Sequence, residues 1–230
     1  MSSLLFDAGV SAVLAASLGT SGGAGDQSVD SLLWQVGTCV VERRYEAARS
    51  FVLSYPVIDG GESSALPSVG ECNDILLRQN VAVSFRQSNY RYALANALVR
   101  RDYGERGPVA IPPELALAMP HELTVPVTQR QKTMVAAFQA DHFYSRVEAE
   151  DAAMAECLVR GEPENVRQWL VTAPGSTAER TKADLLTPLF QTCAVRLQQR
   201  ATSFNVDVMR GPVALAYYRF ANALSKSEVR

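Results

Sequence analysis

The chain is poor in lysine. Only Lys132, Lys182 and Lys226 are lysines among its 22 basic residues, so arginine carries almost all of the positive charge, and the formal net charge is −2. A nucleic-acid binding protein normally presents a basic surface, which this balance does not provide. We therefore expect no nucleic-acid partner, and we interpret most of the arginines as residues of solvated faces.

The sequence also lacks the common catalytic and cofactor motifs. It has no G-x-S-x-G, no P-loop and no G-x-G-x-x-G, so nothing points to a hydrolase, a nucleotide site or a dinucleotide site. It has no C-x-x-C pair and no cysteine at zinc-ligand spacing from a histidine, which argues against a thioredoxin-like redox pair and a structural zinc site. We expect neither a metal nor a cofactor.

Long apolar runs are absent except at the N-terminus. Residues 4–18 are mostly apolar, and small residues follow as far as residue 25. This order resembles the apolar region and cleavage region of a secretory signal peptide, although no basic residue precedes it. We predict a signal peptide over residues 1–24 and a periplasmic or secreted protein, with a cytoplasmic N-terminal helix as the alternative. No other stretch approaches the ~20 apolar residues of a spanning helix, so we expect no transmembrane segment in the mature chain.

An internal repeat organises the rest of the chain. Residues 39–56 match residues 157–174 without a gap, and residues 66–72 match residues 187–193. A period present only twice indicates a duplicated unit rather than a solenoid, which needs at least about three repeats. We predict helical repeat units over residues 26–103 and 144–230, joined by a proline-rich connector, residues 104–143, that contains one helix.

The hydrophobic pattern predicts a mainly α fold of two tandem, related four-helix units. In the first unit, Leu32, Val36 and Val40 form the apolar stripe of a helix that follows Asp30 as N-cap. The later helices of this unit are expected over residues 45–54, 67–77 and 89–101. In the second unit we expect a capping box at 145–148 to open the first helix and Pro163 to open the second. Pro188 is expected early in the third helix, with one or two additional helical turns over residues 178–186 as an alternative, and Asp207 is expected to cap a fourth helix over residues 209–224. Strand-like stretches, residues 81–85 and 202–206, precede each fourth helix, and the connector helix covers residues 128–143.

Each unit contains two cysteines at equivalent places, Cys39 with Cys72 and Cys157 with Cys193. An even number of cysteines in an exported protein indicates disulfides. Four cysteines allow three pairings, and the duplication favours a bridge within each unit, because each unit must have closed its own bridge before it was doubled. We predict the pairs 39–72 and 157–193, each joining the first helix of a unit to the third. A cytosolic protein with free thiols is the alternative.

Two pairs of polar residues are candidates for function. His121 and His142 lie in the connector, each beside a carboxylate, but their spacing matches no metal motif. Arg49 and Arg167 occupy equivalent positions in the two units. They form either a twice-used anion site or, as we favour, structural bonds to helix-end carbonyls and to the glutamate at i−3.

Aromatic residues gather in the fourth helix of each unit. They are Tyr90, Tyr92 and Tyr103 in the first unit and Tyr217, Tyr218 and Phe220 in the second. We interpret them as core and rim residues rather than as an aromatic binding groove.

The repeated pattern is a cysteine followed by [VL]-V, then an arginine, an aromatic residue and [ST]-x-P, with P-x4-C further on. It resembles a group of exported alphaproteobacterial proteins of unknown function, the sphingomonad-type proteins with two cysteine-paired helical units. The resemblance covers residues 40–103 and 157–224. It implies an envelope or secreted location and a mainly helical fold, and it brings no activity and no catalytic residues.

Two functional hypotheses follow. The first is a non-enzymatic periplasmic or secreted binding or interaction protein, with an unknown protein or envelope partner. The alternative is an enzyme whose site lies at the junction of the two units and uses connector residues such as His121 and His142. A deep pocket that holds either histidine with a converging carboxylate would favour the enzyme, and an exposed apolar or aromatic patch would favour the binding protein. The sequence assigns no catalytic, metal-binding or ligand-binding residue.

Overall fold

A computed structural model describes residues 29–54, 67, 70–77, 87–108, 110–115, 142–199 and 204–227. These residues form eight α-helices and one short 3-10 helix, without a strand among them, which confirms the mainly α fold. The first half of the described chain contains α1 (Val29–Arg43), α2 (Tyr45–Leu53), η1 (Gly70–Cys72), α3 (Asn73–Leu77) and α4 (Gln87–Tyr103). The second half contains α6 (His142–Gly161), α7 (Pro163–Leu170), α8 (Thr177–Arg196) and α9 (Val206–Ser227).

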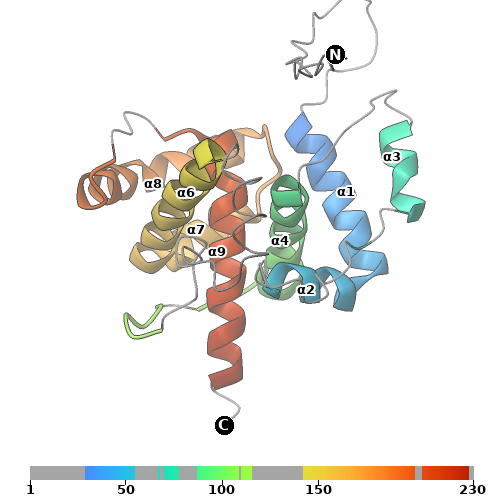
Figure 1. The fold of residues 1–230 in the computed structure, drawn as a ribbon, viewed down its shortest axis with the longest axis horizontal. Helices are drawn as coiled ribbons and strands as arrows, with labels where there is room; N and C mark the ends of the chain where they lie inside the picture. The colour runs from blue at the N-terminus through green and yellow to red at the C-terminus, as the bar shows by residue number, and fades with distance from the viewer. Residues whose placement is uncertain are drawn as a thin grey trace, which may run out of the picture.

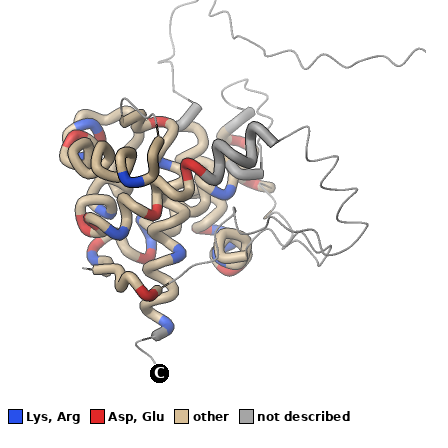
Figure 2. Tube along the Cα trace, turned by 60° about the vertical axis from the view of Figure 1, so that its left-hand side comes forward, with Lys and Arg blue, Asp and Glu red and all other residues tan. Residues whose placement is uncertain are grey.

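The central helices α4 and α9 pack side by side (Figure 1). Helices α1 and α2 lie beside α4, and the short α3 packs on α1. Helices α6 and α7 pack on α9 on the opposite side, and α8 packs on α6 and α7. The buried apolar residues of both halves form one continuous cluster, so the two halves share a core. Basic positions (blue) and acidic positions (red) are interspersed along the backbone of the described residues (Figure 2). The division into two repeat units remains a prediction.

Helix α4 is buried on nearly all of its faces. Every residue from Ala93 to Val99 is less than 9% exposed, as expected for a helix with neighbours on several sides. Small residues allow this close packing: a Cβ atom added to Gly37 of α1 would lie only 2.6 Å from the Ala93 carbonyl oxygen. The fully buried Leu94 and Leu98 contribute to the common core.

The junction between the first two helices has the same geometry in both halves. The Arg44 amide donates to the Val40 carbonyl oxygen at 2.8 Å, and the Glu162 amide donates to the Leu158 carbonyl oxygen at 3.0 Å. Pro163 is the first residue of α7, as predicted, because the first turn of a helix does not need its missing N–H.

The third helix differs from the prediction in both halves. In the first half it is short, because a 3-10 turn at residues 70–72 leads into the five residues of α3. In the second half, Pro188 does not start the helix but lies inside α8. Ser176 caps α8 instead: its hydroxyl accepts from the Glu179 amide at 3.1 Å, while the Glu179 carboxylate accepts from the Gly175 amide at 2.6 Å. This reciprocal cap starts the helix well before Pro188, so the proline does not mark its beginning. Pro188 cannot donate to the carbonyl group four residues earlier, at Asp184, and both residues lie on the exposed face of α8.

The start of α9 also corrects the prediction. The cap is Asn205 rather than Asp207, because Asn205 Oδ1 accepts from the amides of Asp207 at 3.1 Å and Val208 at 3.4 Å. The helix therefore begins before residue 209, and Pro212 lies beyond its first turn. The strand-like stretch predicted at 202–206 is wrong for its described residues, which form the cap and the first residue of α9.

Three further helices begin earlier than predicted. Helix α6 begins at His142, so Ser145 lies within it and the capping box predicted there is wrong. Helix α1 begins at Val29 and α4 at Gln87, one or two residues before the predicted starts, which is the usual uncertainty of helix ends. The strand-like stretch at 81–85 and residues 128–141 of the connector helix lie outside the described residues.

Candidate functional site

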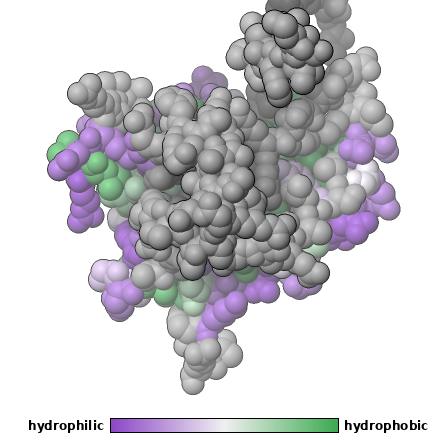
Figure 3. All heavy atoms as spheres, in the orientation of Figure 1, coloured by the Kyte–Doolittle hydropathy of each residue, from purple (hydrophilic) through white to green (hydrophobic). Residues whose placement is uncertain are grey.

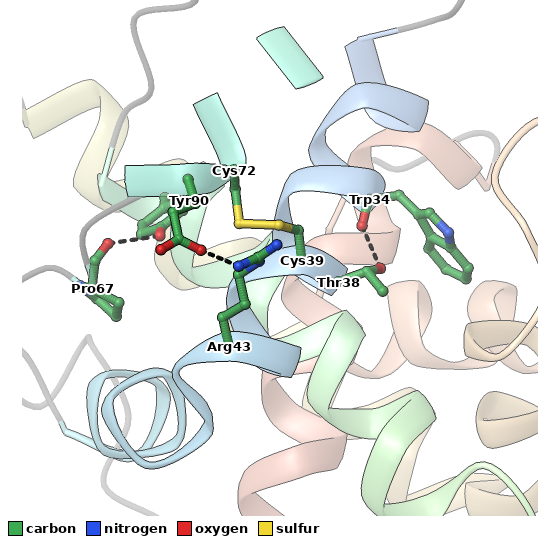
Figure 4. Close-up of a disulfide and its surroundings, with 8 residues drawn as sticks. Trp34, Thr38, Cys39, Arg43, Pro67, Cys72 and Tyr90 are labelled. Carbon is green, nitrogen blue, oxygen red and sulfur yellow. Dashed lines mark hydrogen bonds and ion pairs between the residues drawn. A yellow bond between two sulfur atoms is a disulfide. The ribbon is translucent and has the colours of Figure 1, made fainter. Parts of the chain in front are cut away.

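Both predicted disulfides are present. Cys39 of α1 is bonded to Cys72 of η1, and Cys157 of α6 is bonded to Cys193 of α8, with a Cα–Cα distance of 5.9 Å in each pair. That distance is typical of disulfides. Figure 4 shows the first bridge, with Tyr90 of α4 close to it and the Trp34 indole on the other side of α1. The cysteines are therefore structural links between helices.

The structure does not describe the side chain of either histidine. His121 lies outside the described residues, and His142 is the first residue of α6, with its side chain also outside them. Among the described residues, no group of three or more histidine, cysteine or acidic side chains is placed to hold a metal ion. The enzyme hypothesis built on His121 and His142 remains untested.

Arg167 links the two halves. Its Nε and Nη2 atoms donate to the Glu164 carboxylate at 2.7 and 2.6 Å, and Nη1 donates to the Gly104 carbonyl oxygen at 2.5 Å, just after α4. The hydrogen bonds from Arg167 lower the pKa of Glu164 to about 2, against the opposing effect of burial. Bonds to both a helix-end carbonyl and the i−3 carboxylate are the structural role predicted for this arginine.

Arg49 makes a weaker version of the same link. Its Nη2 atom donates to Asn222 Oδ1 of α9 at 2.8 Å, and its Nη1 atom lies 3.9 Å from the carboxylate of Glu46. Arg49 and Arg167 thus each extend from one half to the central helix of the other half. These contacts favour the structural interpretation over a repeated anion site.

The aromatic residues of helix four belong mostly to the core, as predicted. Tyr90, Tyr217, Tyr218 and Phe220 are at most 4% exposed. The Tyr217 and Tyr218 rings both lie edge-on to Tyr103, 6.1 and 5.9 Å away between centroids. Burial raises the pKa values of Tyr217 and Tyr218 well above that of a free tyrosine. They therefore remain neutral hydroxyls in the interior.

An open pocket lies between α1 and α4, and the sequence reasoning did not identify it. It has a volume of about 370 Å³ and is lined by Thr38, Val41, Glu42, Ala97, Arg100 and Arg101. Val41 and Ala97 are buried and form its apolar wall, whereas Arg101 and Glu42 are exposed at its rim. We refer to this feature as the α1–α4 pocket.

Arg100 is the half-buried charged residue of the pocket. Its guanidinium lies over the Trp34 ring, with the central carbon 3.6 Å from the ring centroid, and Nη2 donates to the Thr38 hydroxyl. The Thr38 hydroxyl in turn donates to the Trp34 carbonyl oxygen at 2.6 Å (Figure 4). Burial lowers the pKa of Arg100. The positive charge of Arg210, whose guanidinium also lies over the Trp34 ring, lowers that pKa further. The arginine still carries its charge, so the pocket has a positive centre that is partly desolvated.

Arg101 connects the pocket to the interface between the halves. Its Nη1 atom donates to the Val41 carbonyl oxygen at 3.0 Å, and its guanidinium lies 4.0 Å from the Tyr45 ring centroid. The Tyr45 hydroxyl donates to Asp102 Oδ2 at 2.9 Å, and the Tyr218 hydroxyl of α9 donates to the same oxygen at 2.8 Å. One carboxylate oxygen therefore joins α2, α4 and α9 beside the pocket.

Arg160 of α6 lies in the second half at the sequence position that corresponds to Glu42 of the pocket, and groups of the chain itself neutralise its charge. Arg160 forms an ion pair of 2.8 Å with Glu156 and donates to the carbonyl oxygens of Pro112 at 2.9 Å and Leu115 at 2.7 Å. Its guanidinium also lies 4.5 Å from the Phe220 ring centroid. Every charged or polar group at this position has a partner within the chain.

The two places differ in their charged residues. In the alignment that matches Cys39 with Cys157, Thr38 corresponds to Glu156 and Glu42 corresponds to Arg160. The first half therefore has a hydroxyl where the second half has the carboxylate that pairs with arginine. Its cations, Arg100 and Arg101, come from α4 instead.

Three large apolar side chains are exposed elsewhere on the described surface. Leu185 and Val195 of α8 are 50% and 80% exposed, and Val208 of α9 is 53% exposed. Apolar surface is visible at the edge of the molecule where α8 lies (Figure 3). These residues are spread along α8 and the start of α9, and they make no hollow with polar groups.

Searches against protein-family models, curated proteins and solved structures found no match to the chain. Among the described helices, none combines the length and the apolar character needed to cross a membrane. The α1–α4 pocket must therefore be interpreted from its own geometry.

Proposed function

We propose that the protein is an exported, non-enzymatic binding protein and that the α1–α4 pocket is its ligand site. The observation that carries the proposal is the pair Arg100 and Arg101, which line one pocket without an ion-pair partner among the described residues. Arginine holds its charge at all physiological pH values, so it binds anions well but is a poor proton donor or acceptor. A pocket of this composition suits binding better than acid–base catalysis.

The proposed location is the periplasm or the outside of the cell. Two disulfides support it, because disulfides persist mainly in oxidising compartments. The apolar N-terminal stretch and the resemblance to exported sphingomonad-type proteins agree with this location. Intact-mass measurement of the protein from its native host tests it: the proposal expects a chain without residues 1–24 and with the mass lost on forming both disulfides. A full-length, reduced chain would contradict it.

A ligand screen tests the proposed site. Compounds that bind there should shift the nuclear magnetic resonance signals of Thr38 and Val41 in the disulfide-bonded protein. The variant Glu42→Trp should block them, because Glu42 is exposed at the rim and a larger side chain there fills the pocket. Glu46→Trp, on an exposed position of α2 outside the pocket, is the matched control. Hits that shift other regions and are unaffected by Glu42→Trp would place the ligand site elsewhere.

A further inference from the structure

Arg100 and Arg101 place two positive charges in one pocket, and no carboxylate of the described residues forms an ion pair with either of them. Each guanidinium makes a hydrogen bond to an uncharged group, Thr38 for Arg100 and the Val41 carbonyl for Arg101. Among the described residues, no carboxylate lies within ion-pair distance of either, and the Arg100 Nε atom is buried without a hydrogen-bond partner. Glu42 acts on Arg100 only from a distance. A buried or half-buried cation without a counter-ion is costly, and an anionic ligand would relieve that cost.

We propose that the α1–α4 pocket binds a small organic carboxylate, held between Arg100 and Arg101 with its hydrocarbon part against Val41 and Ala97. This inference rests on the proposed function, which makes the pocket the ligand site. The second half provides the precedent, because Arg160 there receives its carboxylate from Glu156 at 2.8 Å. In the first half Thr38 stands at the equivalent position, so no carboxylate of the described residues takes the place of Glu156, and a ligand would supply it.

The helix directions favour a carboxylate over a phosphate. Thr38, Val41 and Glu42 belong to the last turns of α1, and Arg100 and Arg101 belong to the last turn of α4. The C-terminal ends of helices carry partial negative charge and present carbonyl oxygens rather than N–H groups. A phosphate dianion normally uses the opposite, N-terminal end of a helix. The negative helix ends oppose any anion, but they oppose a singly charged carboxylate less than a doubly charged phosphate.

The size of the pocket limits the ligand. Its volume of about 370 Å³ is near the lower end of small-molecule sites. Two buried apolar side chains form only one wall, so the hydrocarbon part of the ligand should be short. Benzoate and hexanoate are suitable probes of the carboxylate class. Benzamide is the uncharged analogue of benzoate, and inorganic phosphate represents the other oxyanion.

Titration of these four probes into the full disulfide-bonded chain tests the proposal. The Trp34 indole N–H signal reports binding, because Trp34 stacks on Arg100, and the buried Trp169 indole serves as the internal reference. Trp34→Phe assigns the signal. Benzoate and hexanoate are expected to shift the Trp34 signal in a saturable way, and benzamide and phosphate are not.

Five variants separate the pocket from general charge effects. Arg100→Gln and Arg101→Gln should each weaken benzoate binding about tenfold or more, since each removes a hydrogen bond to a charged group. Arg106→Gln makes the same charge change at an exposed position after α4 and should leave affinity within about twofold. Glu42→Gln should strengthen binding, because it removes a negative charge from the rim, and Glu114→Gln is its exposed control.

The outcomes distinguish this proposal from the proposed function. If Arg100→Gln fails to fold, as judged by circular dichroism, Arg101→Gln and Glu42→Gln decide the result. Equal shifts of Trp34 by benzamide or by phosphate would overturn the carboxylate assignment and leave the pocket as the ligand site. No shift with any probe would also overturn the carboxylate assignment. The proposed function itself fails only if the broader screen finds no compound that Glu42→Trp blocks.

Discussion

The two halves of the molecule fix the start of their central helices, α4 and α9, by different interactions. Each must hold the start of its central helix against the segment that follows its second helix. In the first half, the Tyr90 hydroxyl of α4 donates to the Pro67 carbonyl oxygen at 2.8 Å. In the second half, Arg210 of α9 forms a buried ion pair with Glu179 and donates to the Leu170 carbonyl oxygen at 2.8 Å.

The difference teaches where the molecule is vulnerable. Burial raises the pKa of Tyr90 to about 12, so its neutral hydroxyl is a stable partner at any physiological pH. Arg210 and Glu179 are 7% and 3% exposed, so removal of either one breaks a buried ion pair, which is costly in a protein interior. We therefore expect the second half to tolerate substitution at this junction much less well than the first half.

The largest expected effect is at the buried ion pair. Glu179→Ala should lower the free energy of unfolding by roughly 3–5 kcal/mol, because it removes the carboxylate that forms a buried ion pair with Arg210. Tyr90→Phe should cost only about 1 kcal/mol, the net value of one neutral hydrogen bond. Urea unfolding of both variants measures the difference. The double variant Glu179→Leu with Arg210→Met should recover much of the loss, and similar costs for Tyr90→Phe and Glu179→Ala would refute the contrast.

We also expect the two disulfides to contribute different amounts to the free energy of unfolding. Each closes a loop of 33 or 36 residues, which is worth roughly 4 kcal/mol in the chain-entropy model. Replacing Cys157 and Cys193 by alanine should cost close to that amount, because α8 also packs on α6 and α7 and stays in place. Replacing Cys39 and Cys72 should cost less, because the short α3 packs mainly on α1 and can detach.

Calorimetry and hydrogen exchange check the disulfide comparison. The midpoint of unfolding should fall further for the second-half double variant. Faster exchange confined to residues 70–77 is expected for the first-half double variant. Equal losses of stability, without local exchange at those residues, would contradict the argument that α3 depends on its bridge.

The next largest effects on stability are expected for Arg167 of α7 and Arg49 of α2. Arg167→Gln should destabilise the protein by about 1.5–3 kcal/mol, because its 11% exposed side chain bonds a carboxylate and a backbone carbonyl. Arg49→Gln should cost less than about 1 kcal/mol, since its side chain is 33% exposed and its ion pair is long. Thermal unfolding of the two variants side by side measures the ratio. A larger loss at Arg49 would reverse the proposed ranking of the two links.

The smallest effect concerns pH. The pKa of Glu164 is lowered to about 2 by Arg167, so its contribution to stability is complete above the ordinary carboxyl pKa of about 4.5. The contribution is lost as the pH falls from about 4.5 towards 2. Because Glu164 is 46% exposed, we expect less than about 1 kcal/mol. Glu164→Gln should reduce the acid-induced loss of stability in that range, and Glu46→Gln, at the equivalent exposed position, is the control.

The sequence could predict those features that depend on local or repeated signals. The disulfide pairing followed from the repeat, and the start of α7 followed from Pro163. Pro188 misled the prediction of where the third helix of the second half begins, because a proline inside a helix gives the same sequence signal as a proline in its first turn. The deciding signals were local as well: Ser176 and Glu179 form a capping pattern that was overlooked, and Asn205 lies two residues before the expected cap.

The α1–α4 pocket was beyond sequence reasoning for a different reason. Which faces of α1 and α4 meet is set by packing across more than fifty residues, and Gly37 decides how closely they approach. One signal was available: Arg100 has no acidic residue three or four positions away on its helix, so a local ion pair was excluded. The ion pair between Glu179 and Arg210 likewise joins two different helices, α8 and α9, and no periodic pattern in the sequence predicts it.

The burial of α4 on nearly all faces has a consequence for protein fragments. A chain that ended before α6 would expose the side of α4 that α9 covers, which is a continuous apolar surface. The most complementary cover for that surface is the same surface of a second fragment, related by a two-fold axis. The first half expressed alone should therefore associate in pairs or aggregate, and two copies of it would rebuild in trans the helix contact that the full chain makes in cis.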